Sequence, residues 1–143
     1  MKRRVVITGM GAISPVGNTV ADFWESLKSG KSGLNFIQGF DDVELPVRIV
    51  AQVKGFDPAA YGLERADIRK MDLYCQYAIA AANQAVQDSG LVSGENISPD
   101  RFGVYVGSGI GGISTFVRET GKYLEEGARR ISPLFIPDRK SVV

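Results

Sequence analysis

A strand-like stretch that ends in a glycine-rich segment is the first place where this sequence could hold a ligand. Residues 101–112 have the sequence RFGVYVGSGIGG, in which alternating apolar residues precede four glycines within six positions. Glycine lets a backbone turn sharply and lets another group approach closely. A strand, a glycine turn and a helix, in that order, are how α/β proteins build sites at strand ends. The segment therefore predicts a turn that contacts a ligand or a neighbouring part of the protein.

Gly107, Gly109 and Gly112 also satisfy the G-x-G-x-x-G pattern of dinucleotide-binding sites. That pattern requires an acidic residue about 20 positions further on, after the next strand, to bind the ribose. The corresponding region here holds Arg129 and Arg130 instead. We therefore favour a turn that packs against a neighbouring segment or an acyl chain. A dinucleotide-binding oxidoreductase module stays as an alternative.

The chain offers one cysteine and no histidine for catalysis. Cys75 lies in the middle of a predicted helix, on its apolar face, where no helix N-terminus or histidine would activate a thiol. We interpret Cys75 as a buried structural residue. The lack of histidine removes the commonest general base and the commonest metal ligand. An enzyme made from this chain alone would therefore need unusual chemistry, and we expect no metal site.

Two pairs of basic residues, Arg69-Lys70 and Arg129-Arg130, lie at the ends of predicted elements. Such pairs are usually part of a solvated surface, but at element ends their charges could converge on one anionic partner. Phe135 lies between two prolines on a constrained turn. An apolar side chain there fits either core packing or the lining of an interface or a pocket.

The pattern of apolar residues predicts three strands that alternate with three helices. The predicted strands are residues 4–8, 46–53 and 102–106, of which the first is buried on both faces and the second is half-buried and antiparallel. The predicted helices follow the cap residue Thr19 as far as Gly30, cover residues 70–89, and begin at residue 113. This order indicates an α/β fold with a mostly parallel sheet.

The segments between these elements have less regular patterns. Residues 31–45 lack a period and are predicted as a loop, and residues 55–69 as irregular chain with single helical turns. The helix over residues 70–89 contains five alanines and is expected to be largely buried. Residues 127–137 should form a short turn, because prolines limit regular structure there.

Length and charge set the broad class of the protein. The chain has 143 residues, about one domain, and a net charge of +1, so it has no general attraction to nucleic acid or to anionic membranes. It has no run of about 18 apolar residues that could cross a membrane. Its N-terminus lacks the apolar core of a signal peptide, so we expect a cytoplasmic protein.

The last six residues, DRKSVV, continue none of these patterns. The start of a common sequencing adapter, translated in one frame, encodes the same six residues and then a stop codon. We therefore expect residues 1–137 to be an incomplete domain and residues 138–143 to be a non-native tail.

Four stretches of the chain resemble β-ketoacyl-[acyl-carrier-protein] synthases, the condensing enzymes of bacterial fatty-acid synthesis, and in particular synthase II. In chain order they are VVITGMGAISPVGNTV, RKMDLYCQYAIAAANQAVQDSGL, RFGVYVGSGIGG and RRISPLFIP. The resemblance extends from about residue 2 to residue 137. It implies a thiolase-like fold with α-β-α-β-α layers, of which this chain is the first part of the N-terminal half, and it implies a homodimer.

The resemblance also implies an activity and a set of roles. Members of this family are acyltransferases that catalyse a decarboxylating Claisen condensation of an acyl thioester with malonyl-acyl-carrier protein, and they need no cofactor for it. Their nucleophilic cysteine and two histidines would lie beyond this chain, so the fragment alone is expected to be inactive. Ile110 and Phe135 match residues of the acyl pocket. Arg69, Lys70, Arg129 and Arg130 match positions that meet the acyl carrier protein. A relative without the nucleophile, of the polyketide chain-length-factor type, is the alternative within the same fold.

Overall fold

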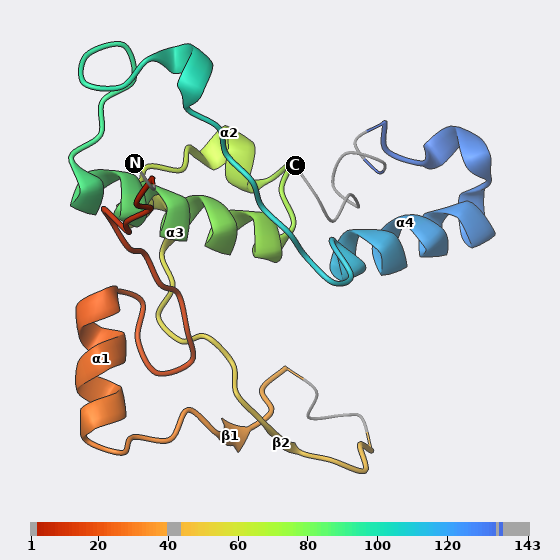
Figure 1. Ribbon diagram of the computed structural model, residues 1–143. Coiled ribbons are helices and arrows are strands. Elements are labelled where there is room, and N and C mark those ends of the chain that lie inside the picture. The colour runs from red at the N-terminus through yellow and green to blue at the C-terminus, as the bar shows by residue number, and fades with distance from the viewer. Residues whose placement is uncertain (1–2, 40–43, 134, 136–143) are drawn as a thin grey trace. The chain divides into compact units, whose positions relative to one another are not determined.

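The computed structural model describes residues 3–39, 44–133 and 135, and the tail expected at residues 138–143 lies outside them. The chain divides into two compact units, shown in sequence colours in Figure 1. The first consists of Met1–Asp57 and Ala81–Ser89, and the second of Pro58–Ala80 and Gly90–Val143. The long helix α3 (Leu73–Ser89) therefore contributes residues to both units.

Helix α1 (Val20–Lys28) of the first unit begins and ends where its sequence predicts. The Asp22 N–H donates to Thr19 Oγ1 at 3.1 Å, and the Thr19 hydroxyl donates in return to Asp22 Oδ2 at 2.8 Å. This reciprocal pair satisfies a backbone donor that the first turn would otherwise leave open. Gly30 follows the helix with φ of 66°, a left-handed conformation that glycine adopts without strain.

The first unit also contains a short antiparallel pair of strands. Strands β1 (Asn35–Phe36) and β2 (Ile49–Val50) pair Asn35 with Val50 and Phe36 with Ile49. The antiparallel strand predicted over 46–53 is thus confirmed for two residues. The prediction that residues 31–45 form only a loop was wrong, because two paired residues are too few to produce an alternating sequence pattern.

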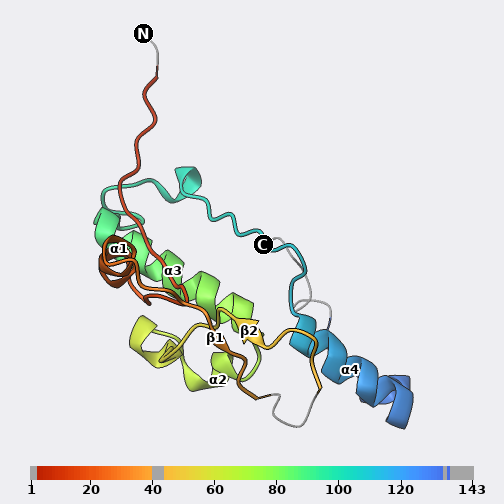
Figure 2. The same cartoon turned by 90° about the horizontal axis from the view of Figure 1, so that it is seen from below.

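An extended segment before α1 runs along the C-terminal half of α3, as Figure 2 shows. The side-chain amide of Gln84 donates to Ala12 O at 3.3 Å and accepts from the Ala12 N–H at 3.3 Å, and it also donates to Asn18 O at 3.0 Å. The side chain of Gln84 therefore satisfies backbone groups of two residues that precede α1, Ala12 and Asn18. Gly9 and Gly11 allow this contact, because a Cβ on either would meet the backbone oxygen of Ala85 or Ala81.

The other two predicted strands are not paired within the part of the chain that the structure describes. Residues 4–8 and 102–106 form no regular strand there. Their apolar side chains face outward, with Val5 97% and Tyr105 84% exposed. A strand needs a hydrogen-bonded neighbour, and among the described residues neither segment has one. The parallel sheet expected from the sequence is accordingly not formed by these residues.

The second unit begins with single helical turns, as predicted. These are η1 (Pro58–Tyr61) and α2 (Arg65–Ile68). Helix α3 starts at Leu73 rather than at residue 70, because Asp72 caps it: Asp72 Oδ1 accepts the Leu73 N–H at 2.7 Å. The expectation that α3 is largely buried was wrong for the described structure, in which only Gln76 and Ala80 of this helix are buried.

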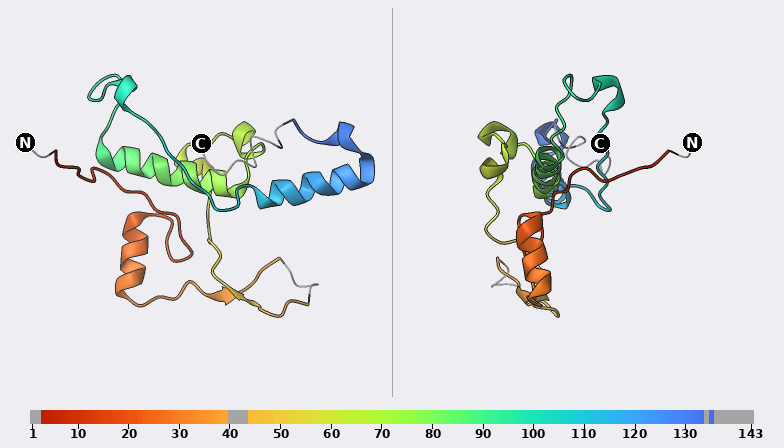
Figure 3. Two further views of the ribbon diagram at one scale, coloured as in Figure 1. Left: turned by 45° about the vertical axis from the view of Figure 1, so that its right-hand side comes forward. Right: turned by 60° about the vertical axis from the view of Figure 1, so that its left-hand side comes forward.

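The remainder of the second unit is built around one amphipathic helix. A short turn, η2 (Pro99–Arg101), is followed by extended chain and by α4 (Ile113–Glu126). Gly127, with φ of 85°, ends α4, and η3 (Ala128–Arg130) then contacts the end of that helix (Figure 3). The predicted helix from residue 113 and the short turn after it are both confirmed.

The described residues enclose very little apolar core. Leu63 and Ala80 are their only buried hydrophobic side chains. Large apolar side chains such as Val5 and Tyr105 are correspondingly exposed in the described structure. No helix in the described ranges is long and apolar enough to span a membrane.

Candidate functional site

The first basic pair lies beside the N-terminus of α4. Arg69 and Lys70 follow α2, and together with Arg118 of α4 they line a small cavity of about 160 Å³. Both residues of the pair are exposed, and Lys70 forms only a 3.7 Å ion pair with Asp67. The pair is therefore available at the surface, as the sequence predicted. Arg118 was not singled out from the sequence, because an isolated arginine in a helix resembles any solvated surface residue.

Asp72, in the same RKMD stretch, accepts hydrogen bonds from the first turns of both α3 and α4. Its Oδ1 atom caps α3 at Leu73, and its Oδ2 atom accepts the Thr115 N–H in the first turn of α4 at 2.9 Å. Both bonds fill donor groups that helix N-termini leave open, where a negative charge is favoured. One largely buried carboxylate thus fastens two helix starts to each other. The Asp72 carboxylate therefore already occupies one of the open donor groups at the α4 N-terminus.

The second basic pair lies at the other end of α4. Arg129 and Arg130 form η3 directly after the helix, and both are exposed. The Arg130 Nε atom lies 3.4 Å from Glu126 Oε2 in an exposed ion pair. The 14 residues of α4 span about 21 Å. The two pairs therefore do not meet in one pocket, and only a partner of protein size could contact both.

Glu119 is the most deeply buried charged residue that the structure describes, with 2% of its surface exposed. Its Oε1 atom accepts from Lys122 Nζ at 2.8 Å and from Arg118 Nε at 3.2 Å. Its Oε2 atom accepts the Ser132 N–H at 2.7 Å. The bonds from Lys122, Ser132 and Arg118 lower the pKa of Glu119 to about 2, against the opposing effect of burial. Glu119 is therefore ionised at neutral pH. Sequence analysis missed it, because its partner Ser132 lies 13 positions away.

The two residues matched to an acyl pocket have different surroundings. Ile110 precedes α4 and is 73% exposed among the described residues. Phe135 is half-buried, and its ring lies on Phe116 of α4 with centroids 6.1 Å apart and planes at 22°. The structure brings Phe135 to the face of α4 that also holds Glu119, but it does not place Ile110 in a pocket.

The glycine-rich loop and the cysteine contribute no chemical site of their own. Added Cβ atoms at Gly107 and Gly109 would meet no other atom within 4 Å, so no close neighbour requires glycine at these two positions among the described residues. Cys75 lies half-buried in α3. The described residues contain no cluster of acidic, cysteine or histidine side chains that could hold a metal ion.

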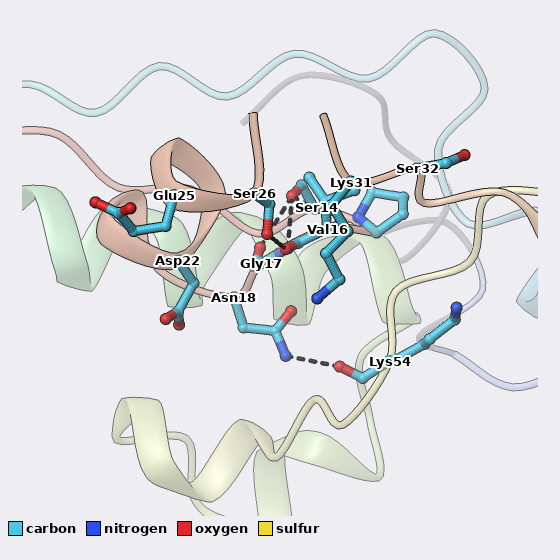
Figure 4. Close-up of a pocket in the computed structure, with 11 residues that line it drawn as sticks. Ser14, Val16, Gly17, Asn18, Asp22, Glu25, Ser26, Lys31, Ser32 and Lys54 are labelled. Atoms are coloured by element: carbon cyan, nitrogen blue, oxygen red, sulfur yellow. Dashed lines mark hydrogen bonds between the residues drawn. The ribbon is translucent and has the colours of Figure 1, made fainter. Parts of the chain in front are cut away.

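A polar hollow of about 400 Å³ lies in the first unit, between the turn before α1 and the residues near Lys54 (Figure 4). The Ser26 hydroxyl donates to Val16 O at 2.6 Å, and Asn18 Nδ2 donates to Lys54 O at 2.8 Å, so these groups fix the loop itself. The charged lining is balanced: Asp22 and Glu25 oppose two lysines. The hollow is therefore part of a loop that its own hydrogen bonds hold in place. The described residues that line it include no nucleophilic side chain paired with a base.

Comparisons with known proteins extend over nearly the whole chain. Residues 2–143 match the family model described as "Beta-ketoacyl synthase, N-terminal domain". The chain is 49% identical over 137 residues to 3-oxoacyl-[acyl-carrier-protein] synthase 2 of Vibrio cholerae, an alignment that covers 95% of this chain and 32% of the relative. It is 48% identical over 136 residues to the synthase 2 of Coxiella burnetii, with the same coverage.

A solved structure shows the same fold. A β-ketoacyl synthase from Burkholderia phymatum superposes with a TM-score of 0.78 at 31% identity, over 98% of this chain and 34% of that one. A second structure, a type II PKS acyl-carrier protein in complex with its ketosynthase bound to the hexaketide, superposes with a TM-score of 0.77 at 28% identity, over 98% and 37%.

The chain spans about a third of the length of the curated relatives that it matches. Within that third, the agreement in sequence confirms the predicted family, and the agreement in structure confirms an α/β fragment of the thiolase-like fold. The catalytic machinery of a condensing enzyme is incomplete in this segment, which contains no histidine. The chain belongs to the β-ketoacyl synthase family, and corresponds to its N-terminal domain.

Proposed function

We propose that this chain is the N-terminal part of a 3-oxoacyl-[acyl-carrier-protein] synthase that elongates fatty acids. The observation that carries the proposal is 49% identity over 137 residues to an enzyme of that name. In the reaction, malonyl-carrier protein loses CO₂, the resulting carbanion forms a carbon–carbon bond to the acyl group, and the acyl thioester bond breaks. The proposed enzyme is a cytoplasmic homodimer that needs no cofactor. Its nucleophile and its histidines come from the remainder of the protein.

In this proposal, the described residues of this segment bind the acyl carrier protein and take no part in the condensation reaction itself. Arg69-Lys70 and Arg129-Arg130 are exposed at opposite ends of α4, a helix about 21 Å long. That length suits the acidic surface of a small protein, and complementary charge speeds encounter and fixes orientation. One structural neighbour is a ketosynthase in complex with an acyl-carrier protein, which supports the same kind of partner here.

We further assign Ile110 and Phe135 to the acyl pocket of the complete enzyme. Ile110 is exposed beside the glycine-rich loop, so it is available to a group supplied by the rest of the protein. Phe135 extends the apolar surface of α4 through its ring contact with Phe116.

The test reverses the charge of the second basic pair in the full-length protein that carries this chain. The double variant Arg129→Glu with Arg130→Glu should raise KM for malonyl-carrier protein by about tenfold, because it replaces attraction by repulsion at the docking surface. Turnover of a malonyl thioester of N-acetylcysteamine should be unchanged, since that substrate has no carrier.

The matched control is Arg3→Glu with Arg4→Glu, which makes the same change of charge at another exposed pair. It should leave both substrates unaffected. Equal losses with both substrates in the Arg129/Arg130 variant would argue against docking. A full-length protein without any condensing activity would favour the chain-length-factor type.

A further inference from the structure

The buried carboxylate of Glu119 accepts one hydrogen bond from a residue outside its own helix, α4. Its Oε1 atom is neutralised by Arg118 and Lys122, which both belong to α4. Its Oε2 atom receives the Ser132 N–H at 2.7 Å, a short bond of the charge-assisted kind. Burying a carboxylate is costly unless it is paired and hydrogen-bonded. The arrangement therefore favours a single position of Ser132 relative to α4.

A second contact fixes the orientation of the same turn. The Phe135 N–H donates to Ser132 O at 3.0 Å, so residues 132–135 are closed by their own hydrogen bond. The Phe135 ring then lies on Phe116, which precedes Glu119 by three positions and so shares its face of α4. The turn is thus attached to one helix face at two points, by a hydrogen bond at its start and by a ring contact at its end.

The residues next to these attachments are the second basic pair. Arg129 and Arg130 occupy η3, and the Ile131 N–H donates to Ala128 O at 3.4 Å immediately before Ser132. The pair is consequently held between Gly127, where α4 ends, and Ser132, which Glu119 binds. With both ends of this short segment fixed, the position of the backbone from which the two arginine side chains project depends on the Glu119–Ser132 bond.

We propose that Glu119 is a positioning residue for carrier-protein docking, which orients Arg129 and Arg130 by holding Ser132 against α4. This inference rests on the proposed function, because it assigns to Glu119 a role in the same docking surface. Glu119 itself touches neither carrier nor substrate. The competing explanation is a purely structural ion cluster, which would affect the stability of the enzyme but not its discrimination between substrates.

Glu119→Gln in the full-length protein is the main test. Glutamine keeps the size of the side chain but loses the charge and one acceptor. When its oxygen accepts from Lys122 and Arg118, its NH₂ group faces the Ser132 N–H, so the bond that holds Ser132 is lost. KM for malonyl-carrier protein should rise by about tenfold, because a displacement of about 1 Å is enough for such an effect. Turnover of the malonyl N-acetylcysteamine thioester should stay unchanged. The control Glu125→Gln removes one exposed carboxylate from the same helix and should change neither value.

A double-mutant cycle separates positioning from structure. When Arg129 and Arg130 are already reversed to glutamate, Glu119→Gln should add less than about a twofold change in KM for the carrier substrate, since the pair that it orients is gone. The proposal is overturned if the increases in carrier KM from the two changes multiply, or if Glu119→Gln reduces activity equally with both substrates. If the Arg129/Arg130 variant alone leaves the carrier KM unchanged, it is the proposed docking function that fails.

A second variant keeps the proposal testable if Glu119→Gln does not fold. Phe116→Leu removes the ring contact without exposing a charge, and it should raise the carrier KM in the same direction. An unchanged carrier KM in Phe116→Leu would contradict the two-point attachment of the turn.

Discussion

Replacing Gly11 with alanine should detach the extended segment before α1 from α3. A Cβ on residue 11 would collide with the backbone oxygen of Ala81, and it would lie 2.8 Å from the Ala81 carbonyl carbon and 2.9 Å from Gln84 Cβ. The obstructing atoms belong to a helix backbone, so they cannot turn aside as a flexible side chain would. The segment itself must move away from the helix.

The cost follows from what that movement breaks. Gln84 holds Ala12 by two hydrogen bonds and Asn18 by a third, and Asp88 accepts the Met10 N–H at 2.9 Å. Overpacking costs about 1–3 kcal/mol, and each hydrogen bond that is lost costs about 1 kcal/mol. If one or two of these four bonds are lost, the expected loss in the free energy of unfolding is about 2–5 kcal/mol.

The assay compares Gly11→Ala with Gly121→Ala in the full-length protein. Gly121 lies inside α4, where an added Cβ meets nothing within 4 Å, so alanine should stabilise the helix by about 0.8–1 kcal/mol. Urea unfolding gives the two stabilities, and hydrogen exchange at Met10 and Ala12 shows whether the segment has opened. The reasoning is refuted if Gly11→Ala stays within about 0.5 kcal/mol of the parent protein or if both variants lose stability equally.

Two further predictions concern the buried carboxylates. The pKa of Glu119 is lowered from its ordinary value near 4.5 to about 2, so its stabilising effect should be complete above about pH 4.5 and disappear as the pH falls toward 2. Acid-unfolding curves of Glu119→Gln should lack that part of the transition. Asp72→Ala should cost about 1–4 kcal/mol in urea unfolding, because it uncaps two helices, and Asp72→Asn should cost less since one acceptor remains. Asp100→Ala, at an exposed position in η2, is the control, and an equal loss there would contradict the capping role.

Helices could be predicted from the sequence because their determinants are local. Thr19 and Asp22 specify the start of α1 within four residues, and Gly127 specifies the end of α4. The start of α3 was displaced by three residues, because Asp72 was not recognised as a cap that also binds Thr115. Strands were harder to predict correctly. The apolar runs at 4–8 and 102–106 have the right composition, but a strand also requires a neighbour, and the described chain supplies none to them.

The candidate site was foreseen only in part. The basic pairs and Phe135 were singled out by their positions at element ends and between prolines, and the family resemblance then suggested their roles. The structure shows them exposed or on the face of α4. Glu119 and Arg118 were missed, since a helix containing both charges has the usual composition of a solvated surface. The importance of Glu119 arises from its burial and from the bond that Ser132 donates to it from 13 positions away, which no local pattern encodes. Gly9 and Gly11 were treated as loop residues, although the reason for glycine there is the close approach of α3.

The uncovered apolar segments around Val5 and Tyr105 have a consequence for synthesis on the ribosome. This chain equals 32% of the Vibrio cholerae relative, so in a protein of that length roughly 290 residues follow it, and translation at about 5–20 residues per second takes about 15–60 s to make them. During that interval the nascent chain exposes these unpaired apolar segments to other macromolecules in the cell. Production of the full-length protein should consequently depend on a chaperone that shields nascent chains, and a cell depleted of that chaperone should accumulate the protein in inclusion bodies.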